Sequence, residues 1–125
     1  MDKQEKVWGR TSCLFLSDFV SVHHLQVLAG GFCSEHFHSR KKNVFHVIRG
    51  RLRVFQWRGA STEAEPDVTV LGAGDSMVIP VGVWHKFQAD EPTECLEIYE
   101  AAPVEEDILR RKAGGLDEPA KGLVQ

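Results

Sequence analysis

Short apolar stretches separated by turn residues make up most of the chain. Residues 19–29 are rich in apolar and β-branched side chains, and Gly30-Gly31 ends this run. Residues 52–57 alternate, so that Leu52 and Val54 face one way and Phe55 and Trp57 the other. Further short runs of this kind cover residues 13–17, 43–48, 68–71, 76–80, 84–88 and 94–100. Many short strands between turns predict an all-β fold, either a sandwich or a barrel.

One segment, residues 103–113, predicts a short C-terminal helix. Pro103 suits a helix start, acidic residues follow it, and basic residues occupy the last turn. Gly114-Gly115 would end the helix, which we expect to cover one open end of the barrel. The predicted organisation is therefore an N-terminal arm (1–10), a barrel (11–102), the helix (103–113) and a C-terminal tail (114–125).

Length and charge limit the function classes. The chain has 125 residues, 42% of them hydrophobic, which suits one globular domain. Its net charge of −3 argues against nucleic-acid binding, and no apolar run is long enough for a membrane span or a signal peptide. Three widely spaced cysteines favour free thiols over a disulfide framework. We therefore expect a cytoplasmic protein.

Three of the six histidines lie between Gly30 and Gly50. His36 and His38 are two residues apart, so on an extended strand their imidazoles project to one face and can converge on one ion. His85 follows a Pro80-x-Gly82 bend that can turn the next strand back into the same barrel. The alternative is a barrel without metal, lined by hydrogen-bonded imidazoles.

These two stretches resemble the two signature motifs of the cupins. Gly30 or Gly31, His36, His38 and Gly50 correspond to the first motif, and Gly74, Pro80, Gly82 and His85 to the second. The resemblance implies a single-domain jelly-roll β-barrel. It also implies that His36, His38 and His85 hold a divalent metal inside the barrel, with zinc, manganese, iron and nickel all open as its identity.

Asn43 stands where the cupin motif has a glutamate. An amide oxygen offers a dipole instead of a full charge, so a divalent ion should bind less tightly and its charge should attract anionic ligands more strongly. Asn43 could be a weak fourth ligand, a hydrogen-bonding partner of bound water, or neither. The basic loop at residues 40–42 would add positive charge near the mouth of the barrel.

Other pocket candidates depend on which strand faces point inward. His46 lies on the face opposite Asn43 and becomes a ligand only if a bulge shifts the register. His23 and His24 are adjacent, so only one can face inward, and each is more ordinary as a packed or surface residue. Glu97 and Tyr99 share a face with Cys95 and become pocket groups if that face points inward. Leu96 and Ile98, on the other face, are the more ordinary core residues.

Several features also resemble the cupin module of bifunctional mannose-6-phosphate isomerases: "VWG", "VFHVIRGRLRVFQW" and "LEIYEAAPVEEDILRRKAGG". This resemblance implies a sugar or sugar-phosphate ligand. Three functions stay open: a metal-dependent, isomerase-like enzyme, a non-catalytic binding or sensing protein, and a three-histidine iron dioxygenase-like enzyme. Because small barrels with open edges often pair them, and cupins usually dimerise, we expect a homodimer.

Overall fold

A computed structural model describes residues 3–59, 64–105 and 107–117, and every regular element in these ranges is a β-strand. Since these residues include no helix, no described helix is long and apolar enough to cross a membrane. The strands are β1 (Lys3–Lys6), β2 (Gly9–Leu16), β3 (Val20–Val27), β4 (Gly31–Phe32), β5 (Glu35–Phe37), β6 (Lys42–Arg49), β7 (Arg51–Trp57), β8 (Asp67–Gly72), β9 (Ser76–Ile79), β10 (Trp84–Ala89), β11 (Thr93–Glu100), β12 (Leu109–Lys112) and β13 (Gly115–Leu116). The predicted all-β fold is confirmed.

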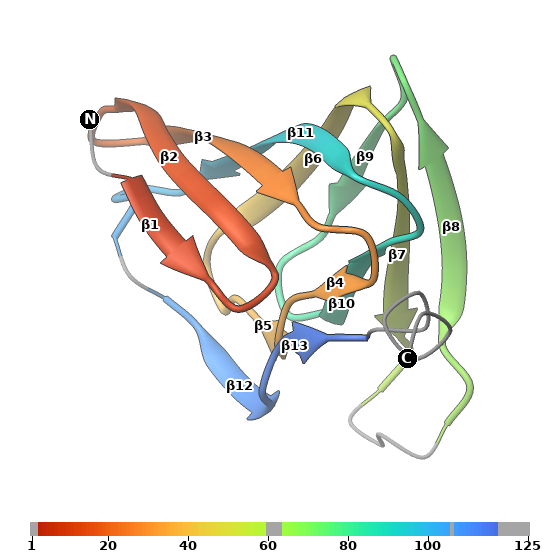
Figure 1. The fold of residues 1–125 in the computed structure, drawn as a ribbon. Coiled ribbons are helices and arrows are strands. Elements are labelled where there is room, and N and C mark those ends of the chain that lie inside the picture. Colours follow the sequence, from red (N-terminus) through yellow and green to blue (C-terminus); the bar gives the residue numbers. More distant parts are fainter. Residues whose placement is uncertain (1–2, 60–63, 106, 118–125) are drawn as a thin grey trace, which may run out of the picture.

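Two antiparallel sheets enclose the core, as Figure 1 shows. One sheet has the strand order β1-β2-β3-β11-β6-β9. The other has the order β12-β5-β10-β4-β13, with β7 pairing with both β10 and β8. Strands that are distant in sequence thus become neighbours, and β5 lies beside β10.

Apolar side chains from both sheets fill the space between them. Phe87 lies at the centre, with ring centroids 5.1 Å from Trp8 and 5.8 Å from Phe45. The alternation predicted for residues 52–57 is present, since Leu52 and Val54 are fully buried. The buried apolar cluster comprises Trp8, Leu25, Val27, Cys33, Phe45, Val47, Leu52, Val54, Leu71, Ile79, Phe87, Ala89 and Cys95.

Leu96 and Ile98 were expected as the core residues of β11. This expectation is wrong, because the other face of the strand points inward. Cys95 lies directly opposite Leu25 on β3 and Val47 on β6, and all three are completely buried. Because side chains alternate along a strand, this register turns Glu97 and Tyr99 to the inner side as well. Leu96 and Ile98 therefore lie on the outer face of the sheet.

The predicted helix at 103–113 is also wrong, because the described part of this segment contains no helix. Residues 109–112 instead form β12, with Arg110 paired to His36 on β5. Arg111 Nε lies 3.2 Å from the buried carboxylate of Glu35, and its guanidinium lies 4.3 Å from the Trp84 ring centroid. Intrinsic helix propensity is a weak preference, and pairing with the open edge of β5 overrides it.

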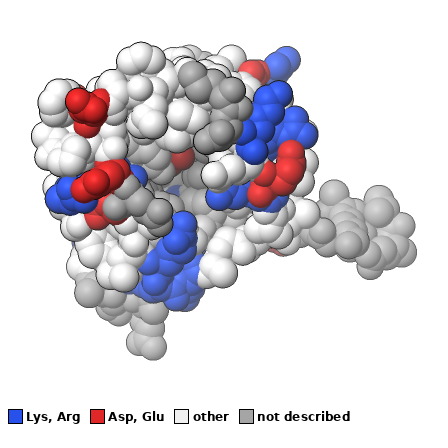
Figure 2. Space-filling model, turned by 90° about the vertical axis from the view of Figure 1, so that its left-hand side faces the viewer, with Lys and Arg blue, Asp and Glu red and all other residues white. Residues whose placement is uncertain are grey.

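Both ends of the described chain add strands to the barrel. In the predicted arm, β1 pairs with β2 of the same chain. In the predicted tail, β13 pairs with β4, while residues 118–125 lie outside the described residues. The remaining domain boundaries stay a prediction. Figure 2 views the molecule from the side of β1 and β12 and shows a hollow in that face.

Candidate metal centre

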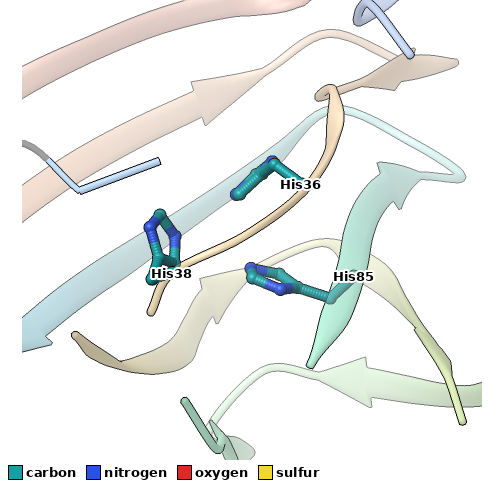
Figure 3. Close-up of side chains that lie close together, drawn as sticks. All are labelled: His36, His38 and His85. Carbon is teal, nitrogen blue, oxygen red and sulfur yellow. The ribbon is translucent and has the colours of Figure 1, made fainter. Parts of the chain in front are cut away.

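His36 and His85 lie directly opposite each other on the neighbouring strands β5 and β10. His38 follows β5 and projects to the same side, so the three rings face one another (Figure 3). The ring centroids of His36 lie 4.9 Å from His38 and 4.5 Å from His85, and those of His38 and His85 are 5.5 Å apart. All three residues are buried.

The Pro80-x-Gly82 bend fixes this arrangement. The backbone N–H of Gly82 donates to the carbonyl of His38 over 2.7 Å, which joins the two histidine-bearing stretches. Gly82 has a φ of +74°, in the left-handed region that favours glycine. The bend therefore directs β10 back alongside β5 and brings His85 to the histidine pair.

Backbone carbonyls set the tautomer of each ring. The Nδ1 atoms of His36, His38 and His85 lie 2.8 Å from Ser34 O, 2.6 Å from Asp107 O and 2.9 Å from Val83 O, respectively. Because a carbonyl oxygen can only accept, each Nδ1 carries the proton and donates. The lone pair of each neutral ring is then on Nε2, and metal-binding histidines usually donate their other ring N–H to a carbonyl in this way.

A divalent cation fits these residues. Nε2 of His36 and Nε2 of His38 are buried and have no hydrogen-bond partner among the described residues. A buried acceptor without a partner costs free energy, and a metal ion would satisfy both atoms. One potential ligand atom from each histidine lies within 4.8 Å of the other two. Three imidazole nitrogens suit zinc, iron or nickel and do not select among them.

The cluster is neutral near physiological pH. Burial, followed by the charges of His85 and His38, lowers the pKa of His36 to about 2. Burial also lowers the pKa of His85 to about 4 and lowers that of His38. Protons therefore compete weakly for the nitrogen lone pairs that a metal would use.

Asn43 is completely buried beside the cluster. Since Nε2 of His85 has only a lone pair, the amide orientation that satisfies both groups directs Nδ2 of Asn43 toward it, at 3.2 Å. In this orientation Nδ2 also lies 3.3 Å from Oε2 of Glu97, and the amide oxygen accepts from the backbone N–H of Val44. Asn43 thus links His85 to Glu97.

Glu97 and Tyr99 line the same cavity as His36, so the structure brings the weaker pocket candidates of β11 to the cluster. Tyr99 donates a hydrogen bond to Glu97, and its ring centroid lies 5.1 Å from that of His38. Burial raises the pKa of Glu97, although the hydrogen bonds from Tyr99 and Asn43 oppose the shift. A carboxyl group at this position can accept or donate a proton.

His46 and His23 lie on opposite sides of the barrel wall, His46 outside and His23 inside. His46 lies on the outer face of β6, where its Nδ1 is 2.6 Å from Oγ of Ser76, and it does not join the cluster. His23 faces inward on β3 and lines the cavity, with its ring centroid 5.6 Å from that of Tyr99. Adjacent histidines indicated only that one of the pair would point inward.

Sequence reasoning missed Asp107, which supports His38 and the basic loop together. Its carbonyl accepts from His38, while its carboxylate accepts from the backbone N–H groups of Ser39, Arg40 and Lys41. Partial burial raises the pKa of Asp107, but these hydrogen bonds and the Ser39 hydroxyl outweigh it and hold the pKa well below its usual range. The sequence did not indicate this role, because the segment was predicted to be a helix and the contacts join residues more than 60 positions apart.

Residues 23–99 match the Cupin domain family, and this match covers most of the chain. The chain therefore belongs to the cupin family, as its two motifs indicated. No curated protein matches the sequence.

Solved structures with the same fold include two oxalate decarboxylases and KdgF. Oxalate decarboxylase from Bacillus subtilis at pH 4.6 shares 18% identity and a TM-score of 0.73, covering 87% of this chain and 29% of that one. The formate complex of Lactobacillus farciminis oxalate decarboxylase shares 21% identity and a TM-score of 0.71, covering 87% and 33%. KdgF from Halomonas sp. shares 19% identity and a TM-score of 0.69, covering 85% and 89%. The chain thus spans about a third of the oxalate decarboxylases, and these likenesses establish the fold alone.

Proposed function

We propose that this chain is a cupin that holds a divalent metal ion on His36, His38 and His85 and binds a small anionic ligand beside it. The observation that carries the proposal is the pair of buried Nε2 atoms, on His36 and His38, which find no hydrogen-bond partner in the part of the chain that the structure describes. Their lone pairs and that of His85 face one region, and backbone carbonyls hold all three rings in the required tautomer. These features are those expected of a preformed three-histidine site.

The neutral ligand set supports an anionic partner. Three imidazoles and the Asn43 amide leave the charge of a divalent ion uncompensated, so open coordination positions would attract an anion. The cavity in front of His36 has a volume of about 390 Å³, which lies in the range of small-molecule sites. One neighbour is named for oxalate and another is a complex with formate, and both of these molecules are small carboxylates. This supports the same ligand class here.

A second candidate, a metal-dependent enzyme, is favoured by Glu97. Proton transfer at a metal-bound ligand needs a base, and the hydrogen-bonded Glu97–Tyr99 pair lies in the same cavity as His36. The non-catalytic binding protein would use the metal and the cavity without this pair. Turnover of aldose and ketose phosphates that is lost in E97Q, with metal retained, distinguishes the enzyme from the binding protein.

Elemental analysis of protein purified without a histidine tag tests the metal site. We expect close to one equivalent of a divalent metal in the wild-type protein and a loss of at least tenfold in H36A and H85A. H46A is the matched control, because His46 lies on the outer face of the same barrel and should leave the metal content unchanged. Equal metal content in all four proteins would contradict the proposal.

Several finer expectations stay predictions. They are a sugar or sugar-phosphate ligand, iron-dependent oxygen chemistry and a cytoplasmic location. The homodimer is another, and exposed apolar side chains on the outer face of the six-stranded sheet, such as Phe15, Ile48 and Val78, are consistent with it. Light scattering at micromolar concentration distinguishes a mass near 28 kDa, twice the 14.0 kDa of one chain, from the monomer.

A further inference from the structure

Two hollows on one side of the barrel extend to the histidine cluster. These adjoining hollows share seven lining residues, and one of them reaches His36 while the other reaches His38. Strands β1, β2, β3, β11 and β12 contribute the shared walls. The residues common to both hollows are Gln4, Lys6, Thr11, His23, Tyr99, Ile108 and Arg110.

Arg110 stands next to the histidines in this cavity. It is paired directly with His36 across β12 and β5, so the two side chains lie on one face of the sheet with their Cβ atoms about 5 Å apart. Its charge contributes to the lowered pKa of both His36 and His38. No acidic partner of Arg110 is found within the described ranges 3–59, 64–105 and 107–117.

The neighbouring Arg111 shows the contrast between the two faces of β12. Its guanidinium pairs with Glu35 and lies over the Trp84 ring, so it stabilises the attachment of β12 to the barrel. Arg110, one residue earlier, points to the cavity side instead. Two successive arginines thus have different environments, and only the Arg110 charge is directed at the candidate site.

Lys6 supplies a second cation from β1. It lines both hollows, its charge acts on Glu97, and the described part of the chain offers it no ion pair. Lys41 adds positive charge nearby, with its Nζ 4.4 Å from the Tyr99 ring centroid. Figure 2 shows both basic and acidic side chains around the hollow on this face. The cavity therefore presents positive charge from separate strands around the path to the histidines.

We propose that Arg110 and Lys6 form an anion subsite, which binds the carboxylate or phosphate of a small organic acid while its hydroxyl or carbonyl oxygens face the three histidines. This inference rests on the proposed function, which it deepens by naming the ligand class and the residues that select it. The planar guanidinium fork of Arg110 matches either group with two hydrogen bonds, and Lys6 adds a point charge. Neutral sugars lack the group that this subsite binds.

Calorimetric titration of the zinc-loaded protein tests the subsite with gluconate, mannose 6-phosphate and neutral mannose. We expect the two anions to bind more tightly than mannose, and R110Q to weaken anion binding by at least tenfold, as for loss of a charged hydrogen-bonding pair. K6Q should weaken it about threefold, and R110K should restore only part of the loss. K3Q is the matched control, because Lys3 lies on the same strand and outside both hollows.

Zinc content, measured on each variant, separates this inference from the proposed function. R110Q with full zinc and weakened anion binding supports the subsite, and the tighter of the two anions assigns it to carboxylate or to phosphate. Equal anion affinity in R110Q and the wild type, or no binding of either anion to the zinc-loaded wild type, would overturn the subsite and leave the metal site standing. Absence of zinc binding in the wild type would instead contradict the proposed function, and titration of the metal-free protein would still test Arg110.

Discussion

Asn43 donates a hydrogen bond from Nδ2 to Nε2 of His85 over 3.2 Å. This contact occupies the lone pair that His85 would offer to a metal ion. The amide therefore competes with the metal in the free protein, and it must rotate if its own oxygen is to become a ligand. A carboxylate at this position could not donate such a hydrogen bond in its charged form.

The N43E substitution should tighten zinc binding by about tenfold or more, because a carboxylate adds a full negative charge and removes the competing donor. The metal-free form of N43E should be less stable than the wild type, since Glu97 lies next to position 43. Competitive zinc titration against a chelating dye measures the first effect and thermal unfolding the second. N43A serves as the control that removes the amide without adding charge. Zinc affinity in N43E no higher than in N43A would contradict a ligand position at residue 43.

The metal-free protein should lose stability as the pH falls below 6.5. Unfolded histidines bind protons near pH 6.5, whereas folded His36 does so only near pH 2 and folded His85 near pH 4. Between pH 6.5 and the folded pKa of each histidine, the unfolded chain binds more protons than the folded chain. Each histidine therefore lowers the free energy of unfolding by about 1.4 kcal/mol for every unit by which the pH falls.

Urea unfolding of the wild type and of H36Q between pH 6.5 and 4.5 measures this dependence. The slope in H36Q should be smaller by the contribution of one histidine. A wild-type stability that is flat over this range would contradict neutral, buried imidazoles.

Removing one partner of the Glu35–Arg111 ion pair should destabilise the fold much more than breaking a surface pair. Its side chains are only 6% and 15% exposed, so R111A would leave a buried carboxylate poorly compensated and should cost about 3–5 kcal/mol of unfolding free energy. R58A is the control, because the exposed Arg58–Asp67 pair should contribute less than about 1 kcal/mol. Denaturant unfolding compares the two variants. Similar losses in both would show that β12 does not depend on this contact.

The all-β fold could be predicted because its signals are local and repeated, whereas the jelly-roll barrel and the meeting of His85 with the histidine pair followed from the resemblance to the cupin motifs. Two-residue periodicity placed most of the strands, and the spacing of His36 and His38 already fixed their common side. The register of β11 could not be predicted, since Glu97 faces inward only because Cys95 pairs with Leu25 and Val47. A polar residue on an inner face violates the usual pattern, and such violations concentrate at functional sites.

The C-terminal segment shows the opposite case, in which a local signal misled. Acids followed by bases after Pro103 favour a helix, but the segment meets the open edge of β5 and pairs there. The same tertiary pairing places Arg110 beside His36 and Asp107 beside His38. Neither neighbour could be found from the sequence, because each depends on how residues about 70 positions apart are brought together.

The most direct test of the account is nitrogen-15 NMR of the histidine side chains with one equivalent of cadmium-113, a spectroscopic substitute for zinc. The structure predicts Nδ1–H tautomers for His36, His38 and His85 before the metal is added, and a one-bond coupling from cadmium to Nε2 of these three residues afterwards. The signals of His24 and His46 should not change. Coupling to other nitrogens, or three rings that keep their metal-free spectra, would contradict the central claim that the barrel holds a three-histidine metal site.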